Sequence, residues 1–217
     1  MIVFDMNETT LDLAPVRAAV DSVAPDAGGF TVFFQKLLQL SMSVSTTGMD
    51  FVAFSSLARH AFDAVVAAAG RRASDDEWAQ VAEGFGQLEA YPDVVGGLER
   101  LRAAGHQTMA LTNSEQAGVE AQCESAGLTH LFDHIVSVEA VSTYKPGPAP
   151  YLHAAQIAGV SPDRMWMVAC HDWDLAGARA VGLNTAFIAR PKMSYAPTYP
   201  AADLHVNDFG ALADHLT

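Results

Sequence analysis

Three features that define other classes of protein are scarce in this chain. Only two of its 217 residues are cysteines, which is typical of a reducing cytoplasm rather than of a disulfide-bonded secreted domain. Its 12 basic residues stand against 25 acidic ones, and the resulting net charge of −13 disfavours nucleic acid and anionic membranes as partners. Its apolar runs stay below the roughly 20 residues that cross a bilayer, and its first residues lack the basic start of a signal peptide. We therefore expect a cytoplasmic protein whose partner is a small molecule.

Short apolar runs that alternate with helical patterns make up most of the sequence. Half of the residues are hydrophobic, which is enough for a sizeable core. Between the apolar runs, apolar residues lie three and four positions apart, and each such segment ends in glycine, a signal for the end of a helix. This alternation predicts an α/β fold with a Rossmann-like parallel sheet covered by helices on both faces. The apolar runs are MIVFD at 1–5, GHQTMALTNS at 105–114, HIVSVE at 134–139, RMWMVACHD at 164–172, NTAFIAR at 184–190 and DLHVND at 203–208.

A long segment after the first apolar run breaks the alternation. Residues 13 to about 90 contain no strand-like run and at least three helical patterns. One of these patterns begins with Ser74 and has Glu77 three residues later, which is the spacing of a capping box. An insertion at the carboxyl end of a strand overhangs the crevice where open α/β sheets bind ligands. The predicted domains are a core over 1–12 and 90–217 and a helical cap, or lid, over 13–89.

Polar side chains follow four of the predicted strands, at the point where each strand ends. Parallel strands bring their carboxyl ends to one edge of the sheet, so these side chains are expected to share one pocket. A carboxylate directly after four apolar residues is costly to bury without a partner, which favours a functional role for Asp5. The four clusters are Asp5 with Asn7 and Thr9; Thr112 with Asn113; Lys145; and His171 with Asp172 and Asp174.

These clusters resemble the four sequence motifs of the haloacid dehalogenase superfamily. The segments KPGPAPY and WDLAGARAVG are most similar to its type II, L-2-haloacid dehalogenase-like members, and the resemblance covers nearly the whole chain. It implies that Asp5 attacks a substrate carbon and forms an ester, and it favours a homodimer because relatives are often dimers. The matching segments are FDMNETTLD at 4–12, LTNS at 111–114, YKPGPAPY at 144–151 and DWDLAGARAVG at 172–182.

The resemblance and the residue types together suggest a role for each candidate. Lys145 is expected to pair with Asp5 and to keep that carboxylate ionised by charge proximity. Asp174 either activates the water that hydrolyses the ester, with help from Lys145 or His171, or caps the following helix. His171 occupies the position of an Asn in the family pattern and is either a site residue or a structural histidine. Tyr151 is either a site hydroxyl or a packing aromatic.

Thr9, Thr112 and Asn113 each have two interpretations, as substrate-binding groups and as helix caps. Thr112 and Asn113 offer a hydroxyl and backbone N–H groups to a substrate oxygen, or they cap the helix predicted for EQAGVEAQ at 115–122. Both roles are compatible, because a capped helix N-terminus also attracts anions. Thr9 has the same two interpretations.

Two departures from the superfamily pattern favour dehalogenation over phosphoryl transfer. The phosphatases carry a proton-donating Asp where this chain has Asn7, and a Mg²⁺-binding acid where it has Cys170, a poor ligand for that ion. A halide leaves without a proton, so an aspartate without a metal ion suffices as the nucleophile. We expect a hydrolase that opens the carbon–halogen bond of a short 2-haloacid and needs no metal or other cofactor. The alternatives are a phosphatase that uses Mg²⁺ with altered ligands, including Asp172, and a binding module that has lost catalysis.

One position departs from the 2-haloacid dehalogenases themselves. Their pattern has an arginine in the first cap helix that holds the departing halide, and FFQKLLQLS at 33–41 places Phe34 there. Phe34 is expected to line the substrate site with an apolar ring. Either the halide has another donor, such as Asn113, Gln35, Lys36 or an arginine elsewhere, or the substrate is not a 2-haloacid.

Overall fold

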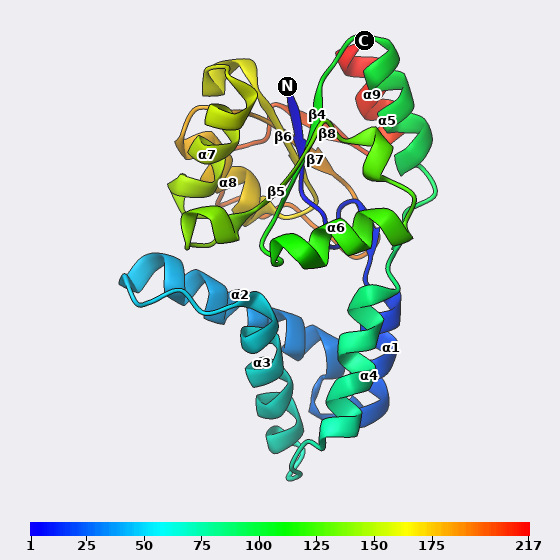
Figure 1. The fold of residues 1–217 in the computed structure, drawn as a ribbon, viewed down its shortest axis with the longest axis vertical. Helices are drawn as coiled ribbons and strands as arrows, with labels where there is room; N and C mark the ends of the chain where they lie inside the picture. The colour runs from blue at the N-terminus through cyan, green and yellow to red at the C-terminus, as the bar shows by residue number, and fades with distance from the viewer.

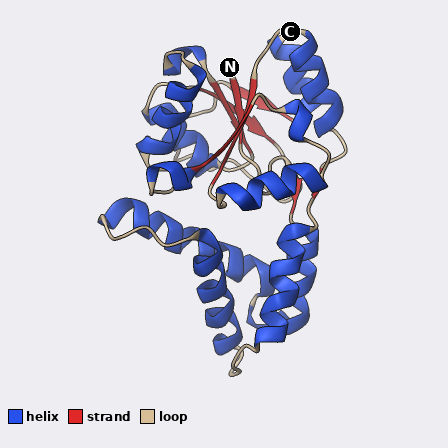
Figure 2. Ribbon diagram, in the orientation of Figure 1, coloured by secondary structure: helices blue, strands red, loops and turns tan.

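A six-stranded parallel sheet forms the centre of the larger part of the molecule, in a computed structural model that describes residues 1–217 (Figures 1 and 2). The strand order is β5-β4-β1-β6-β7-β8, and all neighbouring strands run parallel. The predicted α/β fold is therefore confirmed. The strands are β1 (Ile2–Phe4), β4 (Thr108–Thr112), β5 (His134–Ser137), β6 (Trp166–Ala169), β7 (Asn184–Ile188) and β8 (Leu204–Val206).

Helices cover both faces of this sheet because successive strand residues point to opposite sides. Ile2 and Phe4 belong to the core under α5, α6 and α9, whereas Val3 between them belongs to the core under α7 and α8. The glycines after α5, α6, α7 and α8 all adopt left-handed backbone angles, with φ between 64° and 94°, as their helix-ending pattern predicts. The helices are α5 (Val94–Ala103), α6 (Gln116–Ser125), α7 (Pro148–Ala158), α8 (Asp172–Ala180) and α9 (Phe209–Leu216).

Four further helices form a separate layer that lies across the lower edge of the sheet in Figure 1. In this layer α1 packs on α4 and α2 packs on α3. The capping box is confirmed: Ser74 Oγ accepts from the backbone N–H of Glu77, and the Glu77 carboxylate accepts from that of Ser74 at 2.8 Å. These helices are α1 (Ala14–Val23), α2 (Gly29–Thr47), α3 (Phe54–Ala68) and α4 (Asp75–Gly86). Single 3₁₀ turns lie at η1 (Pro25–Ala27), η2 (Thr129–Leu131), η3 (Val138–Val141) and η4 (Pro162–Arg164).

A two-stranded antiparallel ribbon connects the two parts. It pairs β2 (Leu11–Asp12) with β3 (Glu89–Ala90), so the chain leaves and re-enters the sheet layer at one place. The expectation of no strand between 13 and 90 is wrong at 89–90, because two residues are too short to show an alternating pattern. None of the helices has the length and hydrophobicity that crossing a bilayer requires.

Candidate active site

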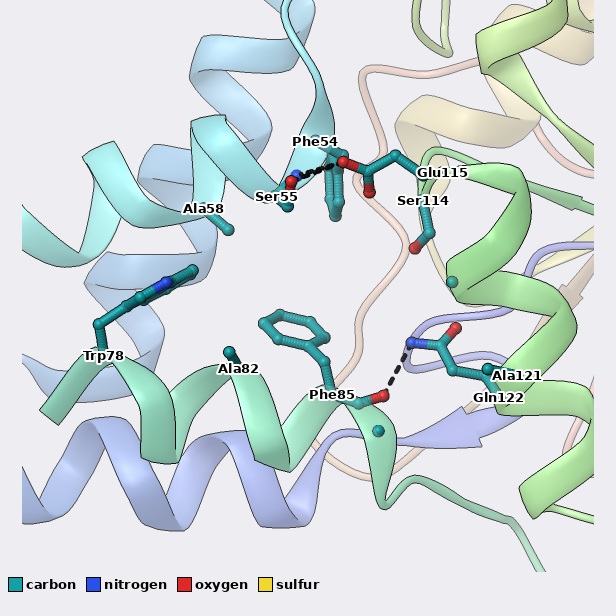
Figure 3. Close-up of a pocket in the computed structure, with 12 residues that line it drawn as sticks. Phe54, Ser55, Ala58, Trp78, Ala82, Phe85, Ser114, Glu115, Ala121 and Gln122 are labelled. Atoms are coloured by element: carbon teal, nitrogen blue, oxygen red, sulfur yellow. Dashed lines mark hydrogen bonds between the residues drawn. The ribbon is translucent and has the colours of Figure 1, made fainter. Parts of the chain in front are cut away.

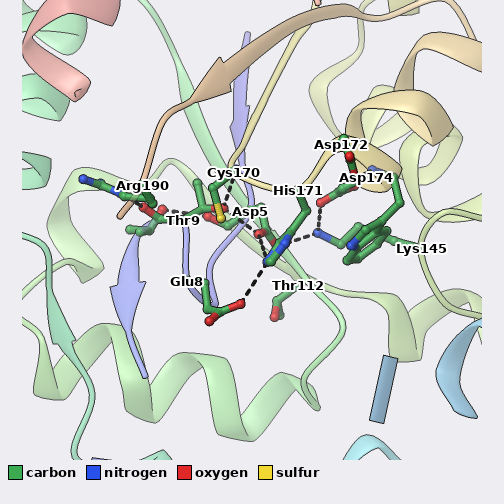
Figure 4. A network of polar contacts seen from close by, with 12 residues as sticks. Asp5, Glu8, Thr9, Thr112, Lys145, Cys170, His171, Asp172, Asp174 and Arg190 are labelled. Carbon is green, nitrogen blue, oxygen red and sulfur yellow. Dashed lines mark hydrogen bonds and ion pairs between the residues drawn. The ribbon is translucent and has the colours of Figure 1, made fainter. Parts of the chain in front are cut away.

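The carboxyl ends of β1, β4 and β6 lie next to one another, because these strands are neighbours in the sheet. Asp5 follows β1, Thr112 ends β4 and His171 follows β6. Lys145 enters the same region from the loop between η3 and α7. Figure 4 shows the side chains from these four segments pointing toward one another. The structure thus brings together the four clusters that the sequence places at strand ends.

Lys145 links two carboxylates in the interior. Its Nζ donates to Asp5 Oδ1 at 2.7 Å, to Asp174 Oδ2 at 2.6 Å and to the backbone oxygen of Leu111 at 3.1 Å (Figure 4). Lys145 is 1% exposed and Asp174 is fully buried. Burial lowers the pKa of Lys145, but the charges of Asp174 and Asp5 outweigh this and raise it above its ordinary value. A charged ammonium therefore sits between the two carboxylates.

The second oxygen of Asp5 is held by Thr9. Thr9 Oγ1 donates to Asp5 Oδ2 at 2.7 Å and accepts from the backbone N–H of Cys170 at 3.0 Å. The backbone of Thr9 is fixed in turn by Arg190, whose Nε donates to its carbonyl at 2.9 Å. Arg190 is absent from the predicted site, although it lies two residues after the carboxyl end of β7 (Asn184–Ile188), where site residues are expected. With Lys145 on one oxygen and Thr9 on the other, the Asp5 carboxylate has a fixed orientation.

Tyr151 combines both of its interpretations, because its hydroxyl binds Asp174 and its ring packs in the core. The Tyr151 hydroxyl donates to Asp174 Oδ1 at 2.6 Å, and its ring is fully buried in the core under α7 and α8. Burial raises the pKa of Asp174, while the positive charge of Lys145 opposes this. Asp174 lies in the first turn of α8, but its two oxygens are used by Lys145 and Tyr151.

His171 lies between two aromatic rings beside the Asp5 carboxylate. Its ring stacks on Trp173 at a centroid distance of 5.3 Å and lies 6.2 Å from the ring of Phe34. Its Nε2 is 4.0 Å from Asp5 Oδ2 and 3.7 Å from Glu8 Oε2. Burial alone lowers the pKa of His171, but the neighbouring Cys170, Asp5 and Glu8 raise it to about 10. His171 is therefore an imidazolium at neutral pH.

Glu8 belongs to this site, and sequence reasoning missed it. Its carboxylate is almost fully buried and faces His171 and, at 3.5 Å, Arg17. Burial raises the pKa of Glu8 above its ordinary value. Its backbone has a φ of 62°, in the left-handed region that non-glycine residues seldom occupy. Strained backbone of this kind is concentrated at functional sites. The turn is held by local hydrogen bonds, from the backbone N–H of Glu8 to the Leu11 oxygen at 2.9 Å and from that of Thr10 to the Met6 oxygen at 2.8 Å. The sequence gives no signal for it, because glutamate is not a residue type that favours left-handed backbone angles.

The remaining predicted residues line a small cavity in front of Asp5. Its volume is about 20 Å³, which holds about one water molecule. Thr112 Oγ1 accepts from the backbone N–H of Ser114, and Asn113 Oδ1 accepts from that of Lys145, so neither side chain caps α6. The residues that line the cavity are Asp5, Asn7, Phe34, Leu38, Phe54, Thr112, Asn113, His171 and Trp173.

The carboxylate oxygens around Asp5 already accept hydrogen bonds, and one amide oxygen, Asn7 Oδ1, is buried without a partner. Asp5 and Asp174 accept from the Lys145 ammonium, and the two oxygens of Asp172 accept backbone N–H groups at 2.8 and 3.0 Å. No group of three or more His, Cys, Asp or Glu side chains is arranged to hold a metal ion. Cys170 adds a soft sulfur rather than a hard oxygen. This donor set does not match the oxygen coordination of Mg²⁺.

The fold and the site define the class of this protein: a Rossmann-like parallel α/β sheet with a helical insertion after its first strand and a lysine-paired aspartate at the strand ends. The chain belongs to the haloacid dehalogenase-like hydrolase family, whose sequence model matches residues 1–182.

Individual relatives agree with this assignment. The chain is 32% identical over 204 residues to (S)-2-haloacid dehalogenase 1 of Pseudomonas sp. strain CBS-3, covering 90% of this chain and 88% of that one. The structure of L-2-haloacid dehalogenase from Xanthobacter autotrophicus is similar with a TM-score of 0.89 and 26% identity, over 98% of this chain and 96% of that chain. A structure of the same enzyme with chloropropionic acid covalently bound gives the same values.

Proposed function

We propose that this chain hydrolyses the carbon–halogen bond of a small 2-haloacid through an ester on Asp5, without a metal ion. The observation that carries the proposal is the Asp5 carboxylate, which lines a cavity while a lysine and a threonine hold its two oxygens. The named relatives support the reaction, since one of them is described with chloropropionic acid covalently bound.

In the first half-reaction, an oxygen of Asp5 attacks C2 of the substrate on the side opposite the halogen. The oxygen–carbon bond forms while the carbon–halogen bond breaks, and the halide leaves with the electron pair. Halide is the anion of a strong acid, so no proton donor is needed. Asn7, an amide that cannot donate a proton as an acid does, is compatible with this step. The fixed carboxylate reduces the entropy lost in reaching the in-line geometry.

Two side chains are available to bind the substrate carboxylate. The Thr112 hydroxyl accepts one hydrogen bond and can still donate its own proton into the cavity. The Asn113 side chain uses its oxygen for the backbone of Lys145, which leaves its NH₂ group to donate. Both line the cavity that Asp5 also lines, so the carboxylate and the reacting carbon can be held together.

The positive charge for the departing halide comes from His171 in place of the arginine that Phe34 replaces. His171 and Phe34 both line the cavity, so a halide leaving C2 meets an imidazolium beside an apolar ring. A second cavity of about 370 Å³ is also lined by these two residues, and its other charged groups are Glu8, Arg17 and Lys192. The two cations offer the released anion a favourable path out of a protein whose net charge is −13.

In the second half-reaction, water attacks the carboxyl carbon of the Asp5 ester and releases a 2-hydroxy acid. Asp174 accepts the proton of this water, and the raised pKa that burial gives Asp174 makes it a better base than an ordinary aspartate. Loss of the Asp5 charge in the ester leaves Lys145 paired with Asp174 alone. Asp174→Asn is expected to form the ester and to hydrolyse it slowly, so intact-protein mass spectrometry should detect the accumulated adduct.

Halide release tests the proposal directly. Wild-type protein is expected to release chloride from L-2-chloropropionate in the presence of EDTA, and Asp5→Asn is expected to release none. Circular dichroism of the Asp5→Asn variant checks that it is folded. Full activity in that variant would rule out Asp5 as the nucleophile. Mg²⁺-dependent release of phosphate from p-nitrophenyl phosphate, with no halide release, would favour the phosphatase alternative.

Three features of organisation belong to the same proposal. Residues 1–12 and 90–217 act as the catalytic core, and 13–89 act as the cap domain that closes it. The protein works in the cytoplasm as a homodimer, a state that light scattering after gel filtration measures.

A further inference from the structure

A third cavity lies between the inserted helices and the sheet layer. It has a volume of about 240 Å³ and is bordered by α3, α4 and α6. Figure 3 shows the rings of Phe54 and Phe85 pointing into it from opposite sides, with Trp78 at one end and Gln122 at the other. A cavity of about 150 Å³ lined by apolar groups can hold a benzene ring, so this one is large enough for a ring-sized group.

Phe54 is a wall of both this cavity and the small cavity in front of Asp5. Its side chain is almost fully buried at the first residue of α3. On the sheet side, Asn113 lines the small cavity and the next residue, Ser114, lines the larger one. The two cavities therefore adjoin, and a rotation of the Phe54 ring is the change that would join them.

Gln122 gives this cavity one specific polar group. Its Nε2 donates to the backbone oxygen of Phe85 at 3.0 Å, which fixes the orientation of the amide (Figure 3). The other end of that amide, Oε1, is buried and has no hydrogen-bond partner, and the residue is 4% exposed. Buried polar atoms are nearly always paired, so an unpaired acceptor in a residue that lines a cavity marks a position for a hydrogen-bond donor.

We propose that this cavity between α3, α4 and α6 binds the substituent on C2 of the substrate, and that this substituent is a ring-sized apolar group ending in a hydrogen-bond donor. The inference rests on the proposed function, because it names the substrate class for the same site. The cavity at Asp5 has a volume of only about 20 Å³, so a large substituent on C2 needs space outside it. The substituent passes Phe54, its apolar part packs against Phe85, and its donor reaches Gln122 Oε1.

Three substrates test the size and the polarity of the substituent. They are 2-bromopropionate, 2-bromo-3-phenylpropionate and 2-bromo-3-(4-hydroxyphenyl)propionate, each assayed by bromide release. Wild-type kcat/KM is expected to be about tenfold or more higher for the hydroxyphenyl substrate than for 2-bromopropionate, a ratio of the size that apolar pockets commonly give. Gln122→Leu is expected to abolish the advantage of the hydroxyphenyl over the phenyl substrate.

A pair of variants on one helix provides the matched control. Ala82 is an exposed residue of α4 that lines this cavity, whereas Ala79 is exposed on the same helix and lines neither this cavity nor the one at Asp5. Ala82→Trp fills the cavity and is expected to lower the ratio of kcat/KM for the hydroxyphenyl substrate over 2-bromopropionate by about tenfold. Ala79→Trp is expected to leave that ratio unchanged.

The outcomes separate this inference from the proposed function. Turnover of 2-bromopropionate without turnover of the two aromatic substrates overturns the inference and leaves the proposed function standing. Equal effects of Ala82→Trp and Ala79→Trp on the ratio also overturn it. Bromide release from none of the three substrates overturns the proposed function and this inference with it.

Discussion

The replacement of Lys145 by methionine tests the buried charge network that orients Asp5. The variant keeps an unbranched apolar stem as far as Cε but lacks the ammonium group, so it removes three hydrogen bonds, to Asp5, Asp174 and the backbone of Leu111. Removing one partner of a buried ion pair costs about 3–5 kcal/mol, because the other charge stays buried without compensation. For a chain of this size, about 2–4 °C of Tm corresponds to each kcal/mol, so we expect Tm to fall by roughly 6–20 °C.

The pH dependence of that loss identifies its cause. Burial raises the pKa of Asp174, and removing the opposing charge of Lys145 raises it further. An acid whose pKa is higher in the folded state than in the unfolded state destabilises the fold as the pH rises through that interval. The Tm deficit of Lys145→Met should therefore be larger near neutral pH than near pH 4.5.

Differential scanning calorimetry at both pH values measures the deficit, and Lys36→Met is the control. Lys36 makes one hydrogen bond, to Gln39 at 3.1 Å, on the outside of the molecule. Its replacement should change stability by no more than about 0.5 kcal/mol. A Lys145→Met variant with a wild-type Tm near neutral pH, or with a deficit independent of pH, would refute the description of a charged buried network.

Three further predictions follow from the same geometry. Thr9→Val leaves a buried backbone N–H without an acceptor and should lower the free energy of unfolding, measured in urea, by about 1–3 kcal/mol, with loss of halide release. Gly177→Ala should lower Tm sharply because its Cβ would lie 2.6 Å from the backbone oxygen of Pro146, whereas Gly96→Ala, which meets open space within a helix, should raise stability by about 0.5–1 kcal/mol. Wild-type halide release should fall as the pH rises through about 10, where the His171 imidazolium deprotonates, and the pH–rate profile of His171→Asn should lack this fall.

Stability should share the same pH dependence. The pKa of His171 is raised in the folded state, from 6.5 to about 10. Its favourable contribution is therefore fully present below pH 6.5 and is lost as the pH rises through about 10.

The sheet and its edge could be predicted from the sequence because both depend on local patterns. The apolar runs around β1, β4 and β6 are long enough to read as strands, and polar residues at their carboxyl ends must meet at one edge. The capping box of α4 is equally local, since it needs only Ser74 and Glu77 at the right spacing.

The features that the sequence did not reveal depend on contacts between distant segments. No distinct helical pattern in the sequence predicts α1. The strands β2 and β3 are two residues each, too short to show an alternating pattern of apolar and polar residues. The left-handed backbone of Glu8 is an exception, because local hydrogen bonds within residues 5–11 hold its turn, but glutamate gives no signal for a left-handed angle. The cavity at Phe54 and Gln122 is formed by three helices that are separate in the chain, so no single segment contains a signal for it.

An isotope experiment tests most directly whether Asp5 bonds to the substrate. The protein, in excess over L-2-chloropropionate, turns over once in H₂¹⁸O, and the Asp5 peptide and the product are analysed by mass spectrometry. An ester on Asp5 that water opens at the carboxyl carbon predicts one ¹⁸O in the Asp5 side chain and none in the first-turnover 2-hydroxy acid. Heavy oxygen in that product, with an unlabelled Asp5, would mean that water attacks the substrate directly and would contradict the account.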